Sequence, residues 1–377
     1  MKIWLKRNLQ GDPIIWAVAI LLALISIAAV YSSSGAIAVK KFGGNTEAPL
    51  FKHIFYIAIS FALMWLAHKI DYRYYSRLSL FALIVSVPLL IAAIFIGTNI
   101  NDASRWLRVP GLGITFQPSD LAKFALIAYL SAMLAKKQQV IAEMKDIDEI
   151  TRTLVPMLAW CGLISGLIIW SNASTGIVLF STCMLLLYIG RVPMKYLMFL
   201  AFIGMFVGGI ALFKGERWKT FVKRIEAVSQ NDPDKIPFQL QQSYIAIATG
   251  GVLGKGPGNS TQRNFLPHPY SDFIFAIILE EYGIWGGIFV LFLFLVLLYR
   301  GMMAVANSER AFGGLLSAGL SFILVIQAFV NMGVAVGLGP ITGLPLPFVS
   351  MGGTSLVFTG ISLGIILSVS KGEVVED

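Results

Sequence analysis

The residue best placed to do chemistry is Asp272, which ends a Leu-Pro-His-Pro-Tyr-Ser-Asp run at 266–272 and stands just before an apolar stretch. A carboxylate at the end of a membrane helix is energetically costly, because a charge near hydrocarbon must be hydrated, paired with an opposite charge or retained for a function. Asp272 also closes residues 214–272, a polar connection long enough to fold over a substrate. We therefore expect Asp272 to be a catalytic residue.

Two further sets of charged residues could bind a ligand. Asp120 and Lys123 follow Pro118 at a spacing of three, which places them on one face of a helix where they can pair. They are either an ion pair that only anchors the helix end or part of a ligand-binding site. Arg105 stands beside Trp106, and its guanidinium is suited to gripping a phosphate with two parallel hydrogen bonds or to anchoring a lipid headgroup.

Two glycine-rich segments have unusual backbones. Residues 250–258 surround Lys255 with glycines, which permit φ > 0 and a close approach to a ligand, although a flexible surface turn explains the pattern equally well. Residues 339–355 contain three prolines and four glycines without a charge. Irregular backbone at membrane depth must be buried in protein or line a polar cavity, so we favour a cavity wall over a plain linker.

Two adjacent carboxylates, Glu280 and Glu281, lie within the apolar stretch that follows Asp272. A carboxylate that faced lipid there would be costly, so at least one must face the protein interior, water or a basic partner. Either is a second acid or base, or a counter-ion to Lys123 or Lys255.

Composition places the chain in a membrane. Of 377 residues, 57% are hydrophobic and 13% are charged, which leaves too little polar surface for a soluble globule of this size. The net charge of +9 comes largely from short loops between apolar runs, where membrane topology explains it, so nucleic-acid binding is not expected. The two cysteines and three histidines show no metal-ligand spacing, and no metal site is predicted.

A bilayer core of about 30 Å needs roughly 20 apolar residues per helix. The sequence therefore predicts an all-α polytopic membrane protein with ten spans, at residues 14–31, 51–68, 78–97, 119–135, 154–170, 173–190, 194–213, 273–298, 312–337 and 352–370. The fifth and sixth are expected to form a tight hairpin or one interrupted pair. The first is read as a retained span and not a removable signal peptide.

Lys and Arg in the alternate short links predict that both termini are cytoplasmic and that 214–272 is extracytoplasmic. Residues 214–237 resemble an interfacial amphipathic helix.

Four ordered motifs resemble the SEDS family, the FtsW and RodA glycosyltransferases of peptidoglycan synthesis. The first two are Ala-Ser-Arg-Trp-Leu at 103–107 with Phe-Gln-Pro-Ser-Asp-Leu-Ala-Lys at 116–123, and Gln-Gln-Ser at 241–243 with the glycine-rich turn. The others are residues 266–281 and 343–355. The resemblance implies a single domain over 1–377, with the family's essential aspartate at Asp272. It also implies substrate-binding residues at Arg105, Asp120, Lys123, Gln242, Ser243, Lys255, Gln262, Pro347, Ser350 and Thr354.

The form of residues 266–276 is more like the division branch (FtsW) than the elongation branch (RodA). The sixth span departs from the family, because Ser171-Asn172-Ala173-Ser174-Thr175-Gly176 stands where many relatives have Gln-Pro-Asp-Leu-Gly-Thr. Met351 also replaces a more common aromatic residue.

The resemblance implies an enzyme that polymerises lipid II into β-1,4 glycan strands with inversion, with Asp272 as general base. Arg105, Lys123 or Lys255 would hold the pyrophosphate, and a divalent cation, Mg²⁺ or Mn²⁺, is left open as a helper. The implied partners are a class B penicillin-binding transpeptidase and other division-complex membrane proteins, at the septum of the bacterial inner membrane. The alternatives are a lipid II flippase, the elongation paralogue, or a scaffold.

Overall fold

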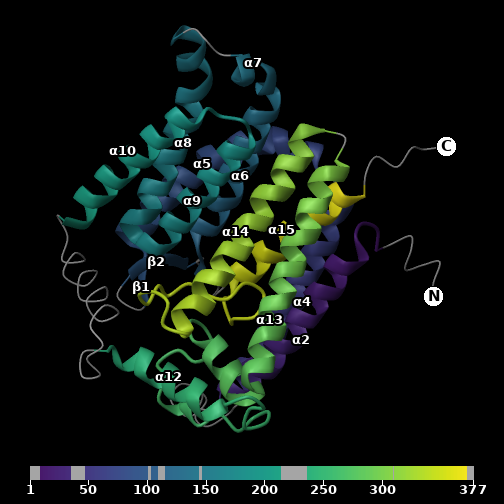
Figure 1. Cartoon of the computed structure of the whole chain (residues 1–377), viewed down its shortest axis with the longest axis vertical. Helices are drawn as coiled ribbons and strands as arrows, with labels where there is room; N and C mark the ends of the chain where they lie inside the picture. Colours follow the sequence, from purple (N-terminus) through teal and green to yellow (C-terminus); the bar gives the residue numbers. More distant parts are fainter. Residues whose placement is uncertain are drawn as a thin grey trace.

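The fold is a bundle of long helices, seen in a computed structural model of the chain that describes residues 9–34, 47–100, 103–108, 115–143, 147–213, 236–308 and 310–371 (Figure 1). A helix occupies each of the ten ranges predicted from apolar length. These helices are α2 (Pro13–Ser33), α4 (Glu47–Lys69), α5 (Arg73–Ile96), α6 (Pro118–Lys136), α8 (Ile147–Ser171), α9 (Ala173–Ile189), α10 (Met194–Phe213), α13 (Ile274–Asn307), α14 (Ala311–Ala335) and α15 (Thr354–Ser370).

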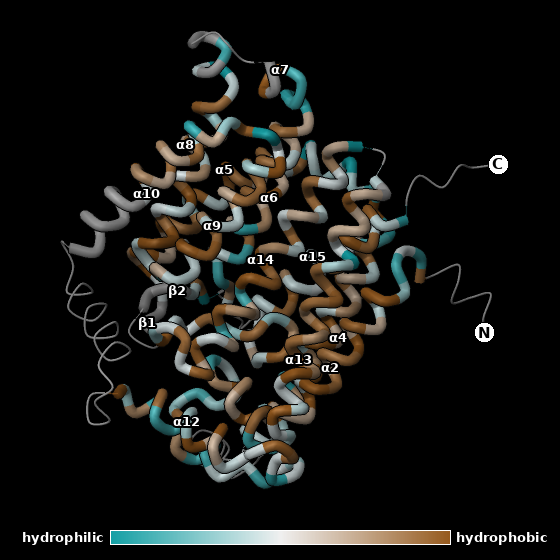
Figure 2. The backbone as a smooth tube through the Cα atoms, viewed as in Figure 1, coloured by the Kyte–Doolittle hydropathy of each residue, from teal (hydrophilic) through white to brown (hydrophobic). Residues whose placement is uncertain are grey.

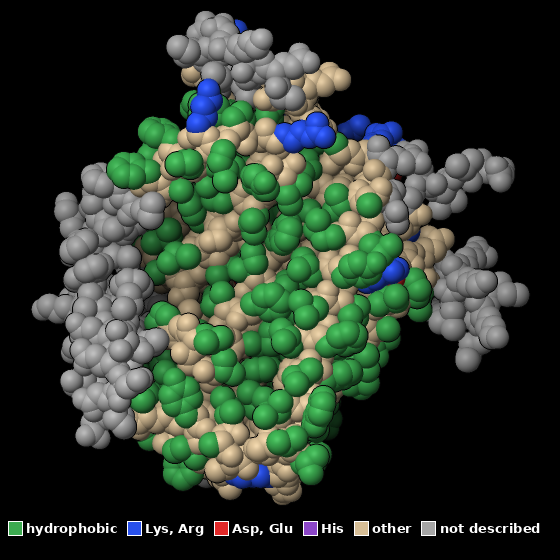
Figure 3. Space-filling model, in the orientation of Figure 1, with side chains coloured by type: hydrophobic (Ala, Val, Ile, Leu, Met, Phe, Trp, Pro, Cys, Tyr) green, Lys and Arg blue, Asp and Glu red, His purple; other side chains and the backbone are tan. Residues whose placement is uncertain are grey.

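The apolar character of these helices identifies an integral membrane protein. Among the described residues, six helical segments are long and apolar enough to cross a bilayer: α2, α4, α5, α14 and most of α8 and α13. The helix α9, residues 194–204 of α10, and α15 are shorter and also apolar. The tube is mostly hydrophobic along the bundle (Figure 2). One face shows a broad band of hydrophobic side chains, with Lys and Arg toward its upper and right edges and at its lower end (Figure 3).

Helices α6 and α14 lie at the centre of the bundle. They pack against each other, and α14 also packs against α9, α13 and α15. Helix α6 is buried along nearly its whole length although Asp120 and Lys123 lie in its first turns. Pro118 starts α6 at a position where the missing N–H costs nothing. A largely buried charged pair therefore lies in the first turns of a central helix.

The connection between α8 and α9 is a tight hairpin. Asn172 caps α9 by accepting a hydrogen bond from the backbone N–H of Thr175 at 3.5 Å. The helices pack so closely that a Cβ on Gly176 would lie 2.4 Å from the Ile169 side chain. This settles the two arrangements left open by the sequence in favour of the hairpin.

A small antiparallel sheet was not predicted. Its strands β1 (Thr98–Ile100), β2 (Ala103–Arg108) and β3 (Thr115–Phe116) pair in that order, with Leu107 opposite Phe116. Strand β2 contacts α5, α6 and α8. The sheet forms in the α5–α6 link, and such short strands carry too little alternation to be recognised in sequence.

Residues 236–272 fold into more structure than expected. They contain helix α12 (Phe238–Gly250) and the short 3₁₀ helix η2 (Gln262–Asn264), neither of which was predicted. Elsewhere in the chain, a short helix α7 (Gln138–Glu143) follows α6. Most of the amphipathic helix expected over 214–237 lies outside the described residues.

The glycine-rich turn after α12 packs against a break in α13. Gly283 has φ +67° and interrupts α13, which leaves carbonyls of the preceding turn without helical partners. The N–H groups of Lys255 and Gly256 donate to the carbonyls of Glu280 and Glu281 at 3.0 and 2.9 Å. The glycines thus allow two backbone segments of the same chain to approach closely, and the turn is not a free surface loop.

This packing predicts that Gly254→Ala destabilises the protein more than Gly258→Ala. Both glycines have φ +81°, so an added Cβ meets the same backbone penalty of about 1–2 kcal/mol. At Gly254 the Cβ would also lie 2.2 Å from the carbonyl oxygen of Glu281, whereas nothing lies within 4 Å at Gly258. Thermal unfolding in detergent measures the difference. Equal shifts of the midpoint for the two variants would contradict the close packing.

Candidate functional site

Asp272 lies where the sequence predicted it, two residues before α13 begins. The side chain is half-buried, and its Oδ1 accepts a hydrogen bond from the Ser271 hydroxyl at 2.9 Å. Burial and the nearby Asp272 charge both raise the pKa of the Tyr270 phenol, with burial the larger cause. Asp272 is therefore a partly exposed carboxylate next to the start of a membrane helix.

The proline-containing link between α14 and α15 holds the segment that carries Asp272. The Met351 N–H donates to the carbonyl of Tyr270 at 2.9 Å, and the Ser350 hydroxyl donates to the carbonyl of Ser271 at 2.6 Å. Ser350 also accepts from the backbone N–H of Leu346 at 2.8 Å. Ser350, which was predicted to bind substrate, is thus buried and bonded to the segment that carries Asp272. Pro347, also predicted to bind substrate, is buried in the same link.

The second half of this link, residues 344–350, is mostly buried in protein, which is one of the two conditions under which irregular backbone is tolerated at membrane depth. Residues 336–343 are half-buried or exposed. Phe348 is in the left-handed region at φ +61°, is 1% exposed and packs edge-on against Phe61. The Val349 carbonyl accepts from the hydroxyl of Ser26 at 2.6 Å. Ser26 lies in turn 2.7 Å from the ring nitrogen Nε2 of the fully buried His53.

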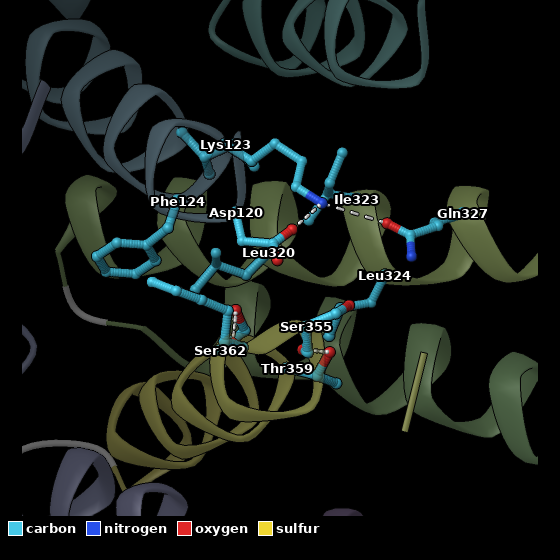
Figure 4. A pocket seen from close by; sticks show the side chains of 12 residues that line it. Asp120, Lys123, Phe124, Leu320, Ile323, Leu324, Gln327, Ser355, Thr359 and Ser362 are labelled. Atoms are coloured by element: carbon cyan, nitrogen blue, oxygen red, sulfur yellow. Dashed lines mark hydrogen bonds and ion pairs between the residues drawn. The ribbon is translucent and has the colours of Figure 1, made fainter. Parts of the chain in front are cut away.

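A pocket lined by both polar and apolar side chains lies between α6, α14 and α15 (Figure 4). It holds about 380 Å³ of empty space, including the part open to the outside, and Asp120 and Lys123 line it. The Lys123 ammonium lies 2.8 Å from Asp120 Oδ1, which confirms the predicted pairing, and donates to Gln327 Oε1 at 3.5 Å. Asp120 Oδ2 is buried without a hydrogen-bond partner among the described residues. The remaining polar lining, Ser355, Thr359 and Ser362, comes from α15.

Glu280 is the counter-ion of Lys255. Their charged atoms lie 2.5 Å apart, and Glu280 is fully buried. The same carboxylate accepts from the side chains of Ser260 and Thr261 and from the backbone N–H groups of Thr261 and Gln262. Of the roles left open by the sequence, the counter-ion role therefore fits Glu280. Its neighbour Glu281 bonds to the Ser32 hydroxyl on α2 and to the Ser260 N–H.

The other residues predicted to bind substrate are dispersed. Ser243 is fully buried and donates to the carbonyl of Ala335 at 2.6 Å, which joins α12 to α14. Gln242 on α12 is half-buried. Gln262 Oε1 and Thr354 Oγ1 are buried without hydrogen-bond partners among the described residues. Arg105 belongs to β2, and its side chain is outside the described part of the structure.

Sequence reasoning missed the polar residues of α14. Gln327 and Asn331 are buried in an apolar helix and contact both the pocket and the segment of Asp272. Two amides one helical turn apart inside a predicted membrane span were a usable signal, because such groups are rare and costly there. Within the described ranges, no group of three or more His, Cys, Asp or Glu is arranged to hold a metal ion.

The fold and the site together define a mainly helical integral membrane protein with a pocket lined by a charged pair inside the bundle and an anchored carboxylate at a helix start. A family model described as a cell cycle protein, named for FtsW, RodA and SpoVE, matches residues 12–374. The chain belongs to this family, which confirms the resemblance drawn from the motifs.

Known proteins similar to the chain carry related names. It is 33% identical over 382 residues to the probable peptidoglycan glycosyltransferase FtsW of Geobacter metallireducens, which covers 98% of this chain and 97% of the relative. It is 32% identical over 374 residues to stage V sporulation protein E of Bacillus subtilis, which covers 97% of this chain and 98% of the relative. A solved structure also matches, that of a chain from a complex described as a peptidoglycan synthase complex with structural coordination of polymerization and crosslinking. The match has a TM-score of 0.73 at 23% identity and spans 96% of this chain and 98% of that chain. This likeness supports the fold.

Proposed function

We propose that this protein is a peptidoglycan glycosyltransferase that polymerises lipid II into β-1,4 glycan strands, with Asp272 as its general base. Relatives named FtsW over nearly the whole chain support the activity and its division branch. The observation that carries the assignment of the base is the position of Asp272, a half-buried carboxylate just before α13. The α14–α15 link donates hydrogen bonds to two main-chain carbonyls of its segment, one from the Met351 N–H and one from the Ser350 hydroxyl.

The proposed reaction is a direct displacement. Asp272 accepts the proton of the acceptor sugar 4-hydroxyl as that oxygen attacks the anomeric carbon of the donor. The bond from the anomeric carbon to the pyrophosphate oxygen breaks, and the configuration inverts because there is a single displacement. The departing pyrophosphate is already a stable anion, so a cation serves it better than a general acid. Lys123 and Lys255 are each paired with a carboxylate, and Lys123 is the candidate cation because it lines the pocket whereas Lys255 does not.

We propose further that all ten long helices cross the membrane and that the chain termini are cytoplasmic. The start of α2 and the end of α15 lie at the same end of the bundle, where the Asp12 N–H donates to the Ser370 hydroxyl at 3.0 Å. Arg300 of α13 also bonds to Asp12 there, at 2.5 Å. Asp272 precedes the opposite end of α13, so it falls on the extracytoplasmic side in this topology. The likeness to a chain of a peptidoglycan synthase complex that coordinates polymerization and crosslinking supports a class B transpeptidase partner, and relatives named FtsW support a septal location.

The direct test is polymerisation of fluorescent lipid II by the purified protein together with its cognate transpeptidase, with glycan strands separated on a gel. Strands are expected only when both lipid II and the protein are present. A parallel assay follows the movement of labelled lipid II across liposomes that contain the protein. Lipid movement without strands would replace the proposal with a flippase.

A further inference from the structure

Two buried amides on α14 connect the two parts of the proposed site. Gln327 and Asn331 are one helical turn apart and are 5% and 1% exposed. A neutral amide inside an apolar helix loses its hydration, so each must form hydrogen bonds within the protein. Their partners are main-chain carbonyls of the α14–α15 link and of Asp272, together with the Lys123 ammonium, and not groups of α14 itself.

Gln327 connects the charged pocket to the α14–α15 link. Its Oε1 accepts from the Lys123 ammonium at 3.5 Å, and its Nε2 donates to the carbonyl of Pro345 at 2.9 Å. The side chain points toward the ammonium inside the pocket (Figure 4). Gln327 therefore fixes where the ammonium lies relative to the link.

Asn331 connects the same link to the base. Its Nδ2 donates to the carbonyl of Leu344 at 2.7 Å and to the main-chain carbonyl of Asp272 at 2.9 Å. Both amide hydrogens are thus used, one on each segment. The contacts run without a gap from Lys123 through Gln327, the 344–345 carbonyls and Asn331 to Asp272.

We propose that Gln327 and Asn331 are positioning residues that set the placement of Lys123 relative to Asp272. The inference rests on the proposed function, because it assigns these two groups to leaving-group stabilisation and proton removal. A displacement needs the attacking and leaving oxygens on opposite sides of one carbon, so the base and the cation must keep a fixed separation. The two amides Gln327 and Asn331, held on one helix, would fix that separation without contacting the sugar.

The two amides are expected to have different kinetic effects. Asn331→Ala releases the backbone of Asp272 and should lower kcat on the order of 100-fold, the effect of a small misplacement of a catalytic group, with little change in the KM for lipid II. Asn331→Asp keeps the shape but has no amide hydrogens to donate, so it should be as defective. Gln327→Ala releases Lys123 and should mainly raise the KM for lipid II.

The control is Ser317→Ala, at the other end of the same helix. Ser317 is also fully buried and donates to a main-chain carbonyl, that of Gly301, at 3.0 Å. This variant loses one buried hydrogen bond of α14 that does not involve Gln327 or Asn331. Thermal unfolding of all four variants shows the cost to stability, and steady-state polymerisation shows kcat and KM separately.

A kcat for Asn331→Ala that falls no more than that of Ser317→Ala at the same loss of stability would overturn the inference. So would a uniform loss of activity in all variants that follows the unfolding midpoint. Asp272→Asn, run beside them, separates the two proposals. If Asp272→Asn still polymerises, the assigned base is wrong, whereas an inactive Asp272→Asn with unaffected Asn331 variants removes only the positioning role.

Discussion

Asp272→Asn is expected to abolish polymerisation of lipid II while the fold and lipid II binding remain. The amide has nearly the same shape as the carboxylate and still accepts from the Ser271 hydroxyl, but it cannot take the proton of the attacking 4-hydroxyl. Loss of a general base costs on the order of 10²–10⁴-fold in rate, which removes visible strands from a gel. The main-chain bond from Asn331 to Asp272 is unaffected by the substitution, so the variant should unfold at the native temperature.

The matched control is Asp71→Asn. Asp71 is an exposed carboxylate that caps the start of α5 and pairs with Arg73 at 3.6 Å. An exposed ion pair contributes at most about 1 kcal/mol, so this variant should polymerise normally. Binding of fluorescent lipid II to each variant shows whether the substrate still enters the site. Strands made by Asp272→Asn at the native rate would exclude Asp272 as the base.

Lys123→Met is expected to have the second largest effect, on stability and on donor binding together. Asp120 and Lys123 have side chains only 3% and 13% exposed. Removal of the ammonium leaves the Asp120 carboxylate buried and unpaired, which costs about 3–5 kcal/mol of folding free energy. The variant should therefore unfold at a lower temperature and need more lipid II.

The double variant Asp120→Asn/Lys123→Met separates the two effects. It contains no buried unpaired charge, so stability should return toward that of the native protein. If Lys123 binds the pyrophosphate, the lipid II concentration required for half-maximal rate stays high in the double variant. Native kinetics in the double variant would mean that the pair serves only the fold. Circular dichroism during heating and polymerisation at graded lipid II concentrations give the two readouts.

The sequence could predict the helices because their determinants are local. A membrane helix needs an uninterrupted stretch of apolar residues, and a helix occupies each of the ten such stretches identified in the sequence. The position of Asp272 just before α13 and the pairing of Asp120 with Lys123 were also predictable, because both follow from spacing along one helix.

Features that depend on contacts across the chain could not be predicted in this way. The partner of Lys255 was ambiguous, because Glu280 stands 25 positions away and is brought near by a break in α13 at Gly283. The glycine-rich turn looked equally suited to a ligand or to a loose surface. Only the folded chain shows that it packs on backbone carbonyls of that break.

The sequence by itself determined the ten helices, the family, and the residue types available for catalysis at Asp272, Asp120 and Lys123. The tertiary structure decided which residues support them. Asn331 meets the carbonyl of Asp272 across 59 positions, and Gln327 meets Lys123 across 204. Sequence periodicity reports which face of a helix is apolar, but a buried amide can bond to any carbonyl that the packing brings within reach.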